Sequence, residues 1–369
     1  MGNGRKTWLV LEDGTYFEGI SFGIEKEICG WVHSDHGVVG YQEILTDPDN
    51  SGAIVNMTYP LIGNYGVNDD DDESDGAQAL ALIVKERSRI VSNWRARSSL
   101  DDFMVRRQIV GMERVDTRTL EIHLRNYGEM KGIVAPADQG LETLRKRVGD
   151  YRIPKAAEQI GGLSVPEGGR EPFAGDERYR VVLWDLGVKR SYIRQLEQCH
   201  CQLVRAPFTA KWDAIWALEP EGLVISNGPG DPRDLGQLVD ELRRALGKLP
   251  VIGISLGCQI LALAAGGNVT AMKAGHHGAN YPVRELISER IAITAQNHSY
   301  RITETPFAEK GFGISHVNLN DGSVEGILSE HHRAGGLQFA PLPDDEGRPH
   351  ELFQRLVRLM EEGRSGNRP

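Results

Sequence analysis

The sequence predicts a two-part α/β protein: a β-rich N-terminal domain over residues 1–150 and a parallel-sheet α/β domain over residues 178–363. The length of 369 residues exceeds what a single hydrophobic core usually holds. The first 150 residues contain short runs in which apolar and polar residues alternate, as in strands with one solvent-facing side. From Arg180 onward, short apolar runs alternate with helical segments, which is the pattern of βαβ units around a parallel sheet.

The N-terminal domain is predicted to begin with a β-hairpin. Residues 7–20 alternate between apolar and polar on both sides of an Asp-Gly pair, which favours a tight turn. Residues 40–45 and 53–57 are interpreted as further short strands. Residues 151–177 are rich in proline and glycine and weakly patterned, so they are expected to form a linker.

The second domain is predicted to hold parallel strands at residues 181–184, 203–204, 222–225 and 251–252. Apolar residues recur at helical spacing over residues 235–246, between the last two of these strands. Residues 351–360 show helical spacing as well, and residues 364–369 are expected to form a disordered tail. Ligands of such sheets bind beyond the carboxyl ends of the strands.

Composition argues against several classes of partner. The net charge of −10 and the lack of a basic stripe disfavour a nucleic-acid partner. No run of 18 apolar residues and no signal-peptide pattern are present, so we expect a cytoplasmic protein with no membrane partner. The four cysteines lack zinc spacing, and the acidic run over residues 68–73 is interpreted as a solvated loop. No metal and no cofactor are expected.

The most distinctive stretch is Gly-Ile-Ser-Leu-Gly over residues 253–257, placed between an apolar strand and an apolar helix. This is the pattern of a nucleophile elbow, a sharp strand-to-helix turn that presents the side chain at its tip, here Ser255. The glycines allow close approach of neighbouring backbone, and the N–H groups that follow lie at a helix N-terminus, where they can stabilise an oxyanion. Taken alone, the pattern predicts a serine hydrolase.

Other motifs point to a different family. Ser-Asn-Gly-Pro-Gly-Asp-Pro precedes the elbow at residues 226–232, and Gly-His-His-Gly-Ala-Asn and Gln-Asn-His follow it at residues 275–280 and 296–298. With these motifs the sequence resembles the class I (triad) glutamine amidotransferases, and more closely the small, glutamine-hydrolysing subunit of carbamoyl-phosphate synthetase. The runs at residues 9–14, 40–48, 58–60, 62–64 and 115–118 resemble the N-terminal domain peculiar to that subunit. The likeness runs from about Trp8 to about Arg355.

The resemblance implies a Cys-His-Glu triad, and this chain differs at all three positions. Ser255 stands at the position of the cysteine. The run Gln-Phe-Ala-Pro-Leu over residues 338–342 matches Gln-Gly-His-Pro-Glu, so Ala340 replaces the histidine and Leu342 replaces the glutamate. In an extended segment, residues two apart would face the same side. A serine hydroxyl without a base is a weak nucleophile, so we expect glutamine hydrolysis to be lost.

The glutamine cleft implied by the resemblance is altered as well. Gly37 stands where the family has serine, and Ser299 and Tyr300 stand where it has glycine and phenylalanine. A side chain at residue 299 would intrude where backbone should approach the amino-acid end of the substrate. The residues expected to line a ligand cleft are Gly37, Gly228, Gly230, Leu256, Gln259, Asn297, His298, Ser299 and Tyr300.

Substitute catalytic groups are conceivable. His331 or His332 could act as a base on Ser255, with Asp321 or Glu325 as the orienting carboxylate, although exposed loop histidines are the simpler interpretation. Cys258 could be a displaced nucleophile, but packing beneath the turn is favoured. His276, His277 and His298 match family positions that are not catalytic, so structural hydrogen bonding is expected.

Three functions are compatible with this pattern. The first is a homologue of the small subunit that has lost glutamine hydrolysis and acts as a non-catalytic or regulatory partner of an ammonia-dependent synthetase, bound to its large subunit. The second is a repurposed enzyme of a specialised biosynthetic pathway, which binds another small molecule in the former glutamine cleft. The third is an atypical glutaminase or serine hydrolase. Glutamate release from glutamine distinguishes the third from the others.

Overall fold

The computed structural model describes residues 4–161, 175–303 and 308–366. The chain divides into two units by its internal contacts. The first comprises Met1–Pro154 together with Met272–Asn280, and the second comprises Lys155–Ala271 together with Tyr281–Pro369.

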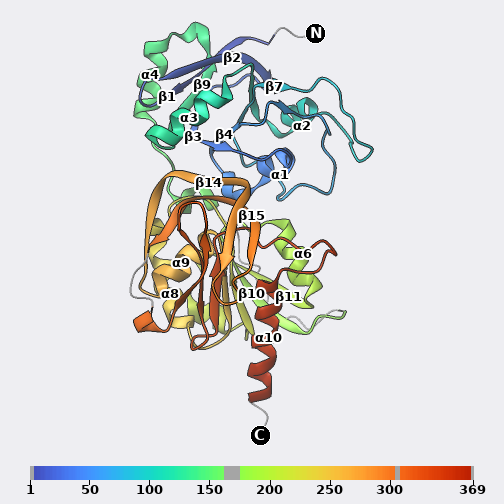
Figure 1. The fold of residues 1–369 in the computed structure, drawn as a ribbon, viewed down its shortest axis with the longest axis vertical. Helices are drawn as coiled ribbons and strands as arrows, with labels where there is room; N and C mark the ends of the chain where they lie inside the picture. Colours follow the sequence, from blue (N-terminus) through green and yellow to red (C-terminus); the bar gives the residue numbers. More distant parts are fainter. Residues whose placement is uncertain (1–3, 162–174, 304–307, 367–369) are drawn as a thin grey trace. The chain divides into compact units, whose positions relative to one another are not determined.

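The described residues of the first unit form a closed barrel in the order β1-β2-β8-β6-β4-β3-β9, and β9 pairs back onto β1 (Figure 1). Helix α4 packs its apolar side against β1 and β9, where Leu144 and Val148 contact Val10 and Ile133. The strands are β1 (Lys6–Leu11), β2 (Tyr16–Gly23), β3 (Ile28–Asp35), β4 (Ala53–Met57), β6 (Ala81–Ile83), β8 (Val110–Glu113) and β9 (Met130–Pro136), with a separate pair β5 (Leu61–Ile62) and β7 (Glu86–Arg87). The helices are α1 (Tyr41–Thr46), α2 (Leu100–Arg107), α3 (Thr117–Tyr127) and α4 (Leu141–Asp150), with short 3-10 turns η1 (Pro48–Asn50) and η2 (Ala137–Gln139).

The predicted N-terminal hairpin is confirmed. Strands β1 and β2 pair antiparallel, with Leu9 opposite Phe17. The turn closes through a hydrogen bond from Leu11 N to Thr15 O of 2.8 Å, and Gly14 adopts a φ of 87° that favours glycine. The predicted strand over residues 53–57 is confirmed as β4.

The predicted strand over residues 40–45 is wrong, because this run forms helix α1. Gly40, with φ of 89°, ends the preceding extended chain. Tyr41 and Leu45, four residues apart, then lie on the same side of the helix and are both fully buried. A short apolar run fits either structure, and tertiary packing decides between them.

A buried polar cluster lies within the first unit. The His33 ring, 3% exposed, lies 4.1 Å from the His277 ring between centroids. His277 Nε2 lies 2.9 Å from the Glu129 carboxylate, which also accepts a hydrogen bond from Trp31 Nε1. Burial, with a smaller contribution from the nearby His277, lowers the pKa of His33 to about 3. His33 is therefore neutral in the folded protein at all physiological pH values.

This buried histidine predicts a loss of stability in acid. The unfolded chain protonates His33 near pH 6.5, whereas the folded protein does so only near pH 3. Unfolding therefore takes up a proton in this window, and the free energy of unfolding should fall by about 1.4 kcal/mol for each pH unit of acidification. Urea unfolding between these pH values should show a shallower dependence in His33→Gln. Leu144→Ala, which removes an uncharged buried side chain, should lower stability without changing the slope, and an equal slope in His33→Gln would refute this assignment.

The described residues of the second unit contribute to a nine-stranded sheet in the order β11-β10-β12-β13-β18-β17-β15-β14-β16. The five strands from β11 to β18 are parallel to one another, and β17 is antiparallel to β18. The strands are β10 (Tyr179–Asp185), β11 (Cys201–Pro207), β12 (Gly222–Ile225), β13 (Val251–Ile254), β14 (Asn268–Glu285), β15 (Ile291–Thr303), β16 (Gly313–Asn318), β17 (Val324–Ser329) and β18 (Ala334–Leu337); residues 272–280 of β14 belong to the first unit. The helices are α5 (Ala156–Ile160), α6 (Arg190–Gln198), α7 (Trp212–Trp216), α8 (Gly236–Ala245), α9 (Leu256–Ala264) and α10 (Glu351–Gly366), with 3-10 turns η3 (Pro232–Leu235) and η4 (Ala308–Lys310).

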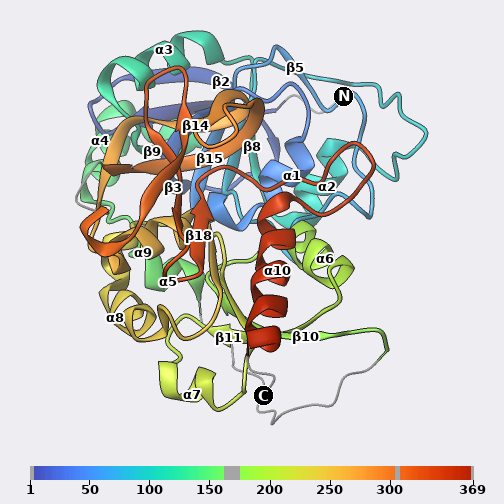
Figure 2. The ribbon, with the colours of Figure 1, turned by 60° about the horizontal axis from the view of Figure 1, so that its bottom comes forward.

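Helices cover both faces of this sheet (Figure 2). Successive residues of a strand point to opposite faces. Val182 and Trp184 of β10 belong to the core that includes α8 and α9. Val181 and Leu183 belong to the core that includes α6 and α10. Because every residue of β12 and β13 is buried, these strands are continuous apolar runs in the sequence. The four predicted strands and the helices at residues 235–246 and 351–360 are all confirmed.

The expected boundaries of the linker and tail stay predictions. The linker over residues 151–177 includes helix α5, and its residues 162–174 lie outside the described part of the chain. Helix α10 extends to Gly366, and residues 367–369 of the expected tail also lie outside that part. None of the described helices is both long and apolar enough to cross a membrane.

Candidate functional site

Ser255 lies at the tip of the predicted strand–turn–helix, between β13 and α9. Its backbone has φ of 50° and ψ of −111°, a conformation that costs a non-glycine residue free energy and that is typical of a nucleophile elbow. Ser255 N donates to Leu337 O at 2.8 Å, and Gln259 N donates to Ser255 O at 3.1 Å. The elbow is thereby anchored to both the adjacent strand and its own helix, and Ser255 is 7% exposed.

The elbow glycines are required by close backbone contacts. A Cβ atom at Gly253 would lie 2.5 Å from Gly257 O. A Cβ atom at Gly257 would lie 2.2 Å from Ile225 O, at the end of the neighbouring strand β12. These two positions accept no side chain without movement of the backbone, so the prediction of a tight turn from the glycine spacing is sound in steric terms.

The run at residues 338–342 lies at the same edge of the sheet as the elbow. Strands β13 and β18 pair in parallel with Ile254 beside Leu337, so both chains leave the sheet at this edge. Ala340 N donates to Ala295 O at 2.9 Å, and Leu342 is 49% exposed. Leu342 N donates to Ala340 O at 3.0 Å, which makes a three-residue turn around Pro341. The expectation of an extended segment here is wrong.

The hydrogen bonding of the Ser255 hydroxyl bears on whether a base can act on it. Among the described side chains of the second unit, none forms a hydrogen bond with this hydroxyl. Ala340 and Leu342 carry no group that can accept a proton. Ser255 therefore keeps the backbone conformation of a nucleophile elbow, while positions 340 and 342 are apolar.

Gln259 connects three elements beneath the elbow. Its Nε2 donates to Gln338 Oε1 and to Tyr300 O, each at 3.1 Å, and the Gln259 and Gln338 side chains are almost fully buried. Gln338 N in turn donates to Glu325 O at 2.8 Å. These bonds join α9, β15 and the end of β18, while the role expected for Gln259 in a ligand cleft stays a prediction.

The loop at residues 226–232 also depends on close backbone contacts. A Cβ atom at Gly228 would lie 2.3 Å from Leu186 O, and one at Gly230, where φ is 93°, would lie 2.6 Å from the Ala156 side chain. Ser226 Oγ accepts a hydrogen bond from Leu186 N at 2.8 Å. The loop is therefore held by the segments that follow β10 and by α5.

His298 takes part in a buried polar network. Its Nδ1 donates to Tyr300 O at 2.8 Å, and its Nε2 lies 3.1 Å from Gln296 Oε1 and 3.6 Å from Glu325 Oε2. The Glu325 carboxylate is fully buried and accepts hydrogen bonds from Asn318 and Ser323. These contacts are of the structural kind expected for this histidine.

The two histidines considered as substitute bases lie at the other end of strand β18 from Ser255. His331 and His332 precede Ala334 at the amino end of β18, whereas Ser255 lies beside its carboxyl end. His332 Nε2 also lies 3.1 Å from Lys310 O, and its ring stacks on Phe312. Four residues of strand separate the two ends by about 13 Å, so neither histidine is beside Ser255.

Three other candidate residues, Cys258, Asp321 and Gly37, make contacts that are typical of structural residues. Cys258 is fully buried, and burial raises the pKa of its thiol well above the ordinary value. Asp321 Oδ1 accepts hydrogen bonds from the N and Oγ of Ser323, as in a turn. Gly37 belongs to the first unit, where its N donates to Asp35 Oδ1 at 2.6 Å.

Leu256, Asn297 and Ser299 lie close in sequence to the elbow residues already described. Leu256 is the first residue of α9 and is 2% exposed. Asn297 and Ser299 lie on β15 on either side of the buried His298, and both are partly exposed. Their expected place in a ligand cleft stays a prediction.

Sequence reasoning missed the residues that fix the run at residues 338–342. Gln195 Nε2 donates to Pro341 O, and Gln195 Oε1 accepts from His350 N, each at 2.8 Å. The Phe339 ring packs edge-on against the His316 and His350 rings. Burial lowers the pKa of His350 to about 4. These partners lie far apart in sequence, so no local pattern indicates them.

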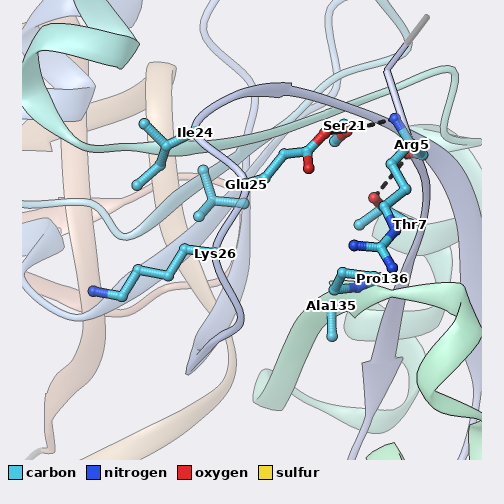
Figure 3. Close-up of a pocket in the computed structure, with 9 residues that line it drawn as sticks. Arg5, Thr7, Ser21, Ile24, Glu25, Lys26, Ala135 and Pro136 are labelled. Carbon is cyan, nitrogen blue, oxygen red and sulfur yellow. Dashed lines mark hydrogen bonds between the residues drawn. The ribbon is translucent and has the colours of Figure 1, made fainter.

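One pocket lies in the first unit, beside the N-terminal strand of the barrel (Figure 3). It is a small pocket that is open to solvent, and it is lined by Arg5, Thr7, Ser21, Ile24, Glu25, Lys26, Val110, Ala135 and Pro136. Ser21 Oγ accepts from Arg5 N at 2.8 Å, and Thr7 Oγ1 donates to Arg5 O at 3.1 Å. Ser21 Oγ also donates to Glu25 Oε1 at 3.4 Å, so the polar groups of the lining bond to one another and to the barrel backbone.

Comparison with known proteins identifies the family. The model for the carbamoyl-phosphate synthase small chain, CPSase domain, matches residues 9–134, and the model for glutamine amidotransferase class-I matches residues 182–354. The chain is 39% identical to the carbamoyl phosphate synthase pyrimidine-specific small chain of Halalkalibacterium halodurans, over 96% of this chain and 97% of the relative. It is 38% identical to the protein of the same name from Bacillus subtilis, over 96% of each.

A solved structure of a glutamine amidotransferase from Thermotoga maritima matches with 16% identity and a TM-score of 0.35, over 51% of this chain and 84% of that one. The second unit has the class I amidotransferase-like fold, and the first is the β-rich barrel that precedes it. With relatives this similar over nearly its whole length, the chain belongs to the carbamoyl-phosphate synthase small-chain family.

Proposed function

We propose that this chain is a small-chain homologue that does not hydrolyse glutamine and that serves as a non-catalytic or regulatory partner of an ammonia-dependent carbamoyl-phosphate synthase. The observation that carries the proposal is the elbow hydroxyl of Ser255, which has no hydrogen-bonded base among the described residues of the second unit. The name "small chain" of the relatives supports a large-subunit partner.

The chemistry of amide hydrolysis supports the proposal. A glutaminase of this class needs a thiolate, an imidazole that moves protons and a carboxylate that orients the imidazole. Ser255 offers a hydroxyl that stays protonated at neutral pH, and Ala340 and Leu342 offer no titratable group. Loss of the nucleophile or base from a serine protease reduces kcat by roughly 10⁶-fold. Together, the three changes leave the elbow without a route to a covalent intermediate.

The retained glycines support a folded scaffold with a role of its own. Gly253, Gly257 and Gly228 each lie where a side chain would collide with backbone, and all three keep the residue type that the fold requires. A chain that had simply decayed would have no reason to retain these while it changed at the triad positions. The proposal therefore assigns the second unit a structural role within a synthase assembly.

The alternatives differ in support. A serine hydrolase needs a base beside Ser255, and the positions of His331 and His332 at the far end of β18 weigh against it. A repurposed enzyme is supported only by the changes at Gly37, Ser299 and Tyr300, which would alter which small molecule the elbow region accepts. An atypical glutaminase would release glutamate from glutamine, which a glutamate assay measures.

The partner role is tested by reconstitution with a carbamoyl-phosphate synthase large subunit from the same cell. We expect the two chains to co-purify and the complex to make carbamoyl phosphate from ammonium, bicarbonate and ATP. Ser255→Ala should change this rate by less than about 2-fold, because the hydroxyl takes no part in the reaction. Failure to form a complex at micromolar concentrations, or a large loss of ammonia-dependent synthesis in Ser255→Ala, would overturn the proposal.

A further inference from the structure

The indole of Trp94 is almost entirely exposed to solvent. It lies in the loop between β7 and α2, and 93% of its surface is accessible, the largest fraction among the exposed large apolar side chains of the described chain. Ile90, in the same loop, is 74% exposed. A tryptophan side chain is usually well buried, because its ring carries a large apolar area. The position of Trp94 is therefore not explained by packing within this chain.

The loop that carries Trp94 is anchored on both sides of the indole to the segment after β5. Before the indole, Ser92 N donates to Asn64 O at 2.9 Å. After it, Arg97 N donates to Val67 O at 2.8 Å. Because both ends of the loop are held by backbone hydrogen bonds, binding a partner would cost less backbone freedom than binding by a free segment.

Between these anchors, Trp94 lies at the tip of a tight turn. Asn93 closes the turn, since its carbonyl accepts from Ala96 N at 3.1 Å and its Oδ1 accepts from Arg95 N at 2.9 Å. Gly66, with φ of 68°, packs against the loop, and a Cβ atom there would lie 2.8 Å from Ala96 Cβ. The turn therefore holds the indole outward.

Three arginines accompany Trp94 in this loop. Residues 88–98 contain Arg89, Arg95 and Arg97 and no acidic side chain, although the whole chain carries a net charge of −10. A guanidinium has five N–H donors, and the Arg97 side chain is 75% exposed, so it keeps donors for a further acceptor. Tryptophan and arginine are among the residues most enriched at the positions that dominate protein–protein affinity. The composition of the loop is therefore that of a binding hot spot.

The acidic run that the sequence predicts to be a solvated loop contacts two of these arginines. Arg95 Nη2 lies 2.9 Å from Asp71 Oδ1, and Arg97 Nε lies 3.6 Å from Asp69 Oδ2. Exposed ion pairs of this kind contribute little to folding stability. They do limit the orientations of the two guanidinium groups, which lowers the entropy that these side chains lose on binding.

The place of the loop in the chain indicates its partner. Trp94 lies within residues 9–134, which match the CPSase domain of the carbamoyl-phosphate synthase small chain. The glutamine amidotransferase class-I model matches only residues 182–354. The loop therefore belongs to the part of the chain that is matched by a synthase domain rather than by a general amidotransferase domain, and the large subunit of the synthase is the partner that it fits.

We propose that Trp94 is the centre of a surface that docks on the large subunit of the synthase, with Ile90, Arg89, Arg95 and Arg97 around it. The indole enters an apolar pocket of the large subunit, and the guanidinium groups donate to carboxylate or carbonyl oxygens at the rim of that pocket. The inference rests on the proposed function, because it names the residues that make the contact with the partner which that function requires.

The affinity of the purified chain for the large subunit from the same cell tests this surface. We expect Trp94→Ala to weaken the complex by at least about 30-fold, the effect of losing a hot-spot residue. Arg97→Glu should weaken it by about 10-fold, because it places a carboxylate opposite acceptor oxygens. Tyr127→Ala is the matched control, since it removes another aromatic ring of the first unit that is 71% exposed, and it should change the affinity by less than about 2-fold.

A second measurement reports on burial of the indole itself. Hydroxyl radicals oxidise exposed tryptophan, and mass spectrometry of the peptide that contains residue 94 follows this reaction. We expect Trp94 to be oxidised several-fold more slowly in the complex than in the free chain, with Tyr127 unaffected. Thermal unfolding checks that each variant is folded, which the exposure of Trp94 and Arg97 favours.

Equal affinity of Trp94→Ala and the wild type, unchanged oxidation of Trp94 in the complex, or an equal loss in Tyr127→Ala would overturn the docking surface and leave the proposed function standing. Self-association of the chain alone that is lost in Trp94→Ala would assign the loop to a second copy and would also overturn it. Failure of the wild-type chain to bind the large subunit would overturn both. The affinity of the wild type therefore distinguishes failure of this surface from failure of the proposed function.

Discussion

Replacing Ser255 by cysteine, Ala340 by histidine and Leu342 by glutamate in a Tyr300→Phe background is expected to raise glutamate release from glutamine by at least about 10³-fold over the wild type. The cysteine supplies the nucleophile at the elbow, and the histidine and glutamate supply the base and its orienting carboxylate at the neighbouring edge of the sheet. Strand β18 runs parallel to β13 with Ile254 beside Leu337, so residues 338–342 leave the sheet at the edge where the elbow lies. A coupled glutamate assay on the purified chain measures the effect.

The control for this gain is Ser255→Cys alone. A thiol at the elbow without an imidazole should stay at the background rate, because little thiolate forms at neutral pH and no group returns the proton to the leaving ammonia. Activity in Ser255→Cys alone, or an inert but folded quadruple variant, would contradict the assignment of the triad positions.

Gly257→Val is expected to lower the free energy of unfolding of the chain by more than about 4 kcal/mol, which is a large part of the stability of a typical domain. The reason is steric. A Cβ atom at residue 257 lies 2.2 Å from Ile225 O and 2.7 Å from Ser226 O, and both are backbone atoms that cannot rotate away. The elbow would have to move off β12 to admit the side chain. Urea unfolding and soluble yield measure the change.

Gly236→Ala is the matched control. Gly236 is the first residue of α8, and its φ of −53° is helical. A Cβ atom added there has no heavy atom within 4 Å. There the substitution should be neutral or stabilise by up to about 1 kcal/mol, because it restricts the unfolded chain. Equal stability of Gly257→Val and the wild type would show that the elbow is looser than its backbone contacts indicate.

The fold could be predicted where local patterns and packing agree. Strands β12 and β13 are apolar runs because both faces of the sheet are covered by helices there, and the glycines around Ser255 predict the elbow. Helix α1 was not predictable from its sequence, because a run of six residues with apolar positions 41, 44 and 45 fits a strand as well as a helix. There the packing of Tyr41 and Leu45 in the core decides the structure.

The site could be predicted only in part, for a similar reason. The place of Ser255 follows from its motif, which is local. The bond from Gln195 to Pro341, the bond from Ala340 to Ala295 and the contact of Arg233 with the Tyr300 ring join segments far apart in sequence, so no spacing reveals them. The exclusion of His331 and His332 as bases likewise needed the direction of β18 relative to β13.

The central claim is tested most directly by supplying the reconstituted complex with glutamine as the sole nitrogen donor. The account predicts no glutamate above the uncatalysed background and no carbamoyl phosphate, with synthesis restored when ammonium is added. Stoichiometric release of glutamate with formation of carbamoyl phosphate, by a complex whose small chain carries the unaltered Ser255, would contradict it.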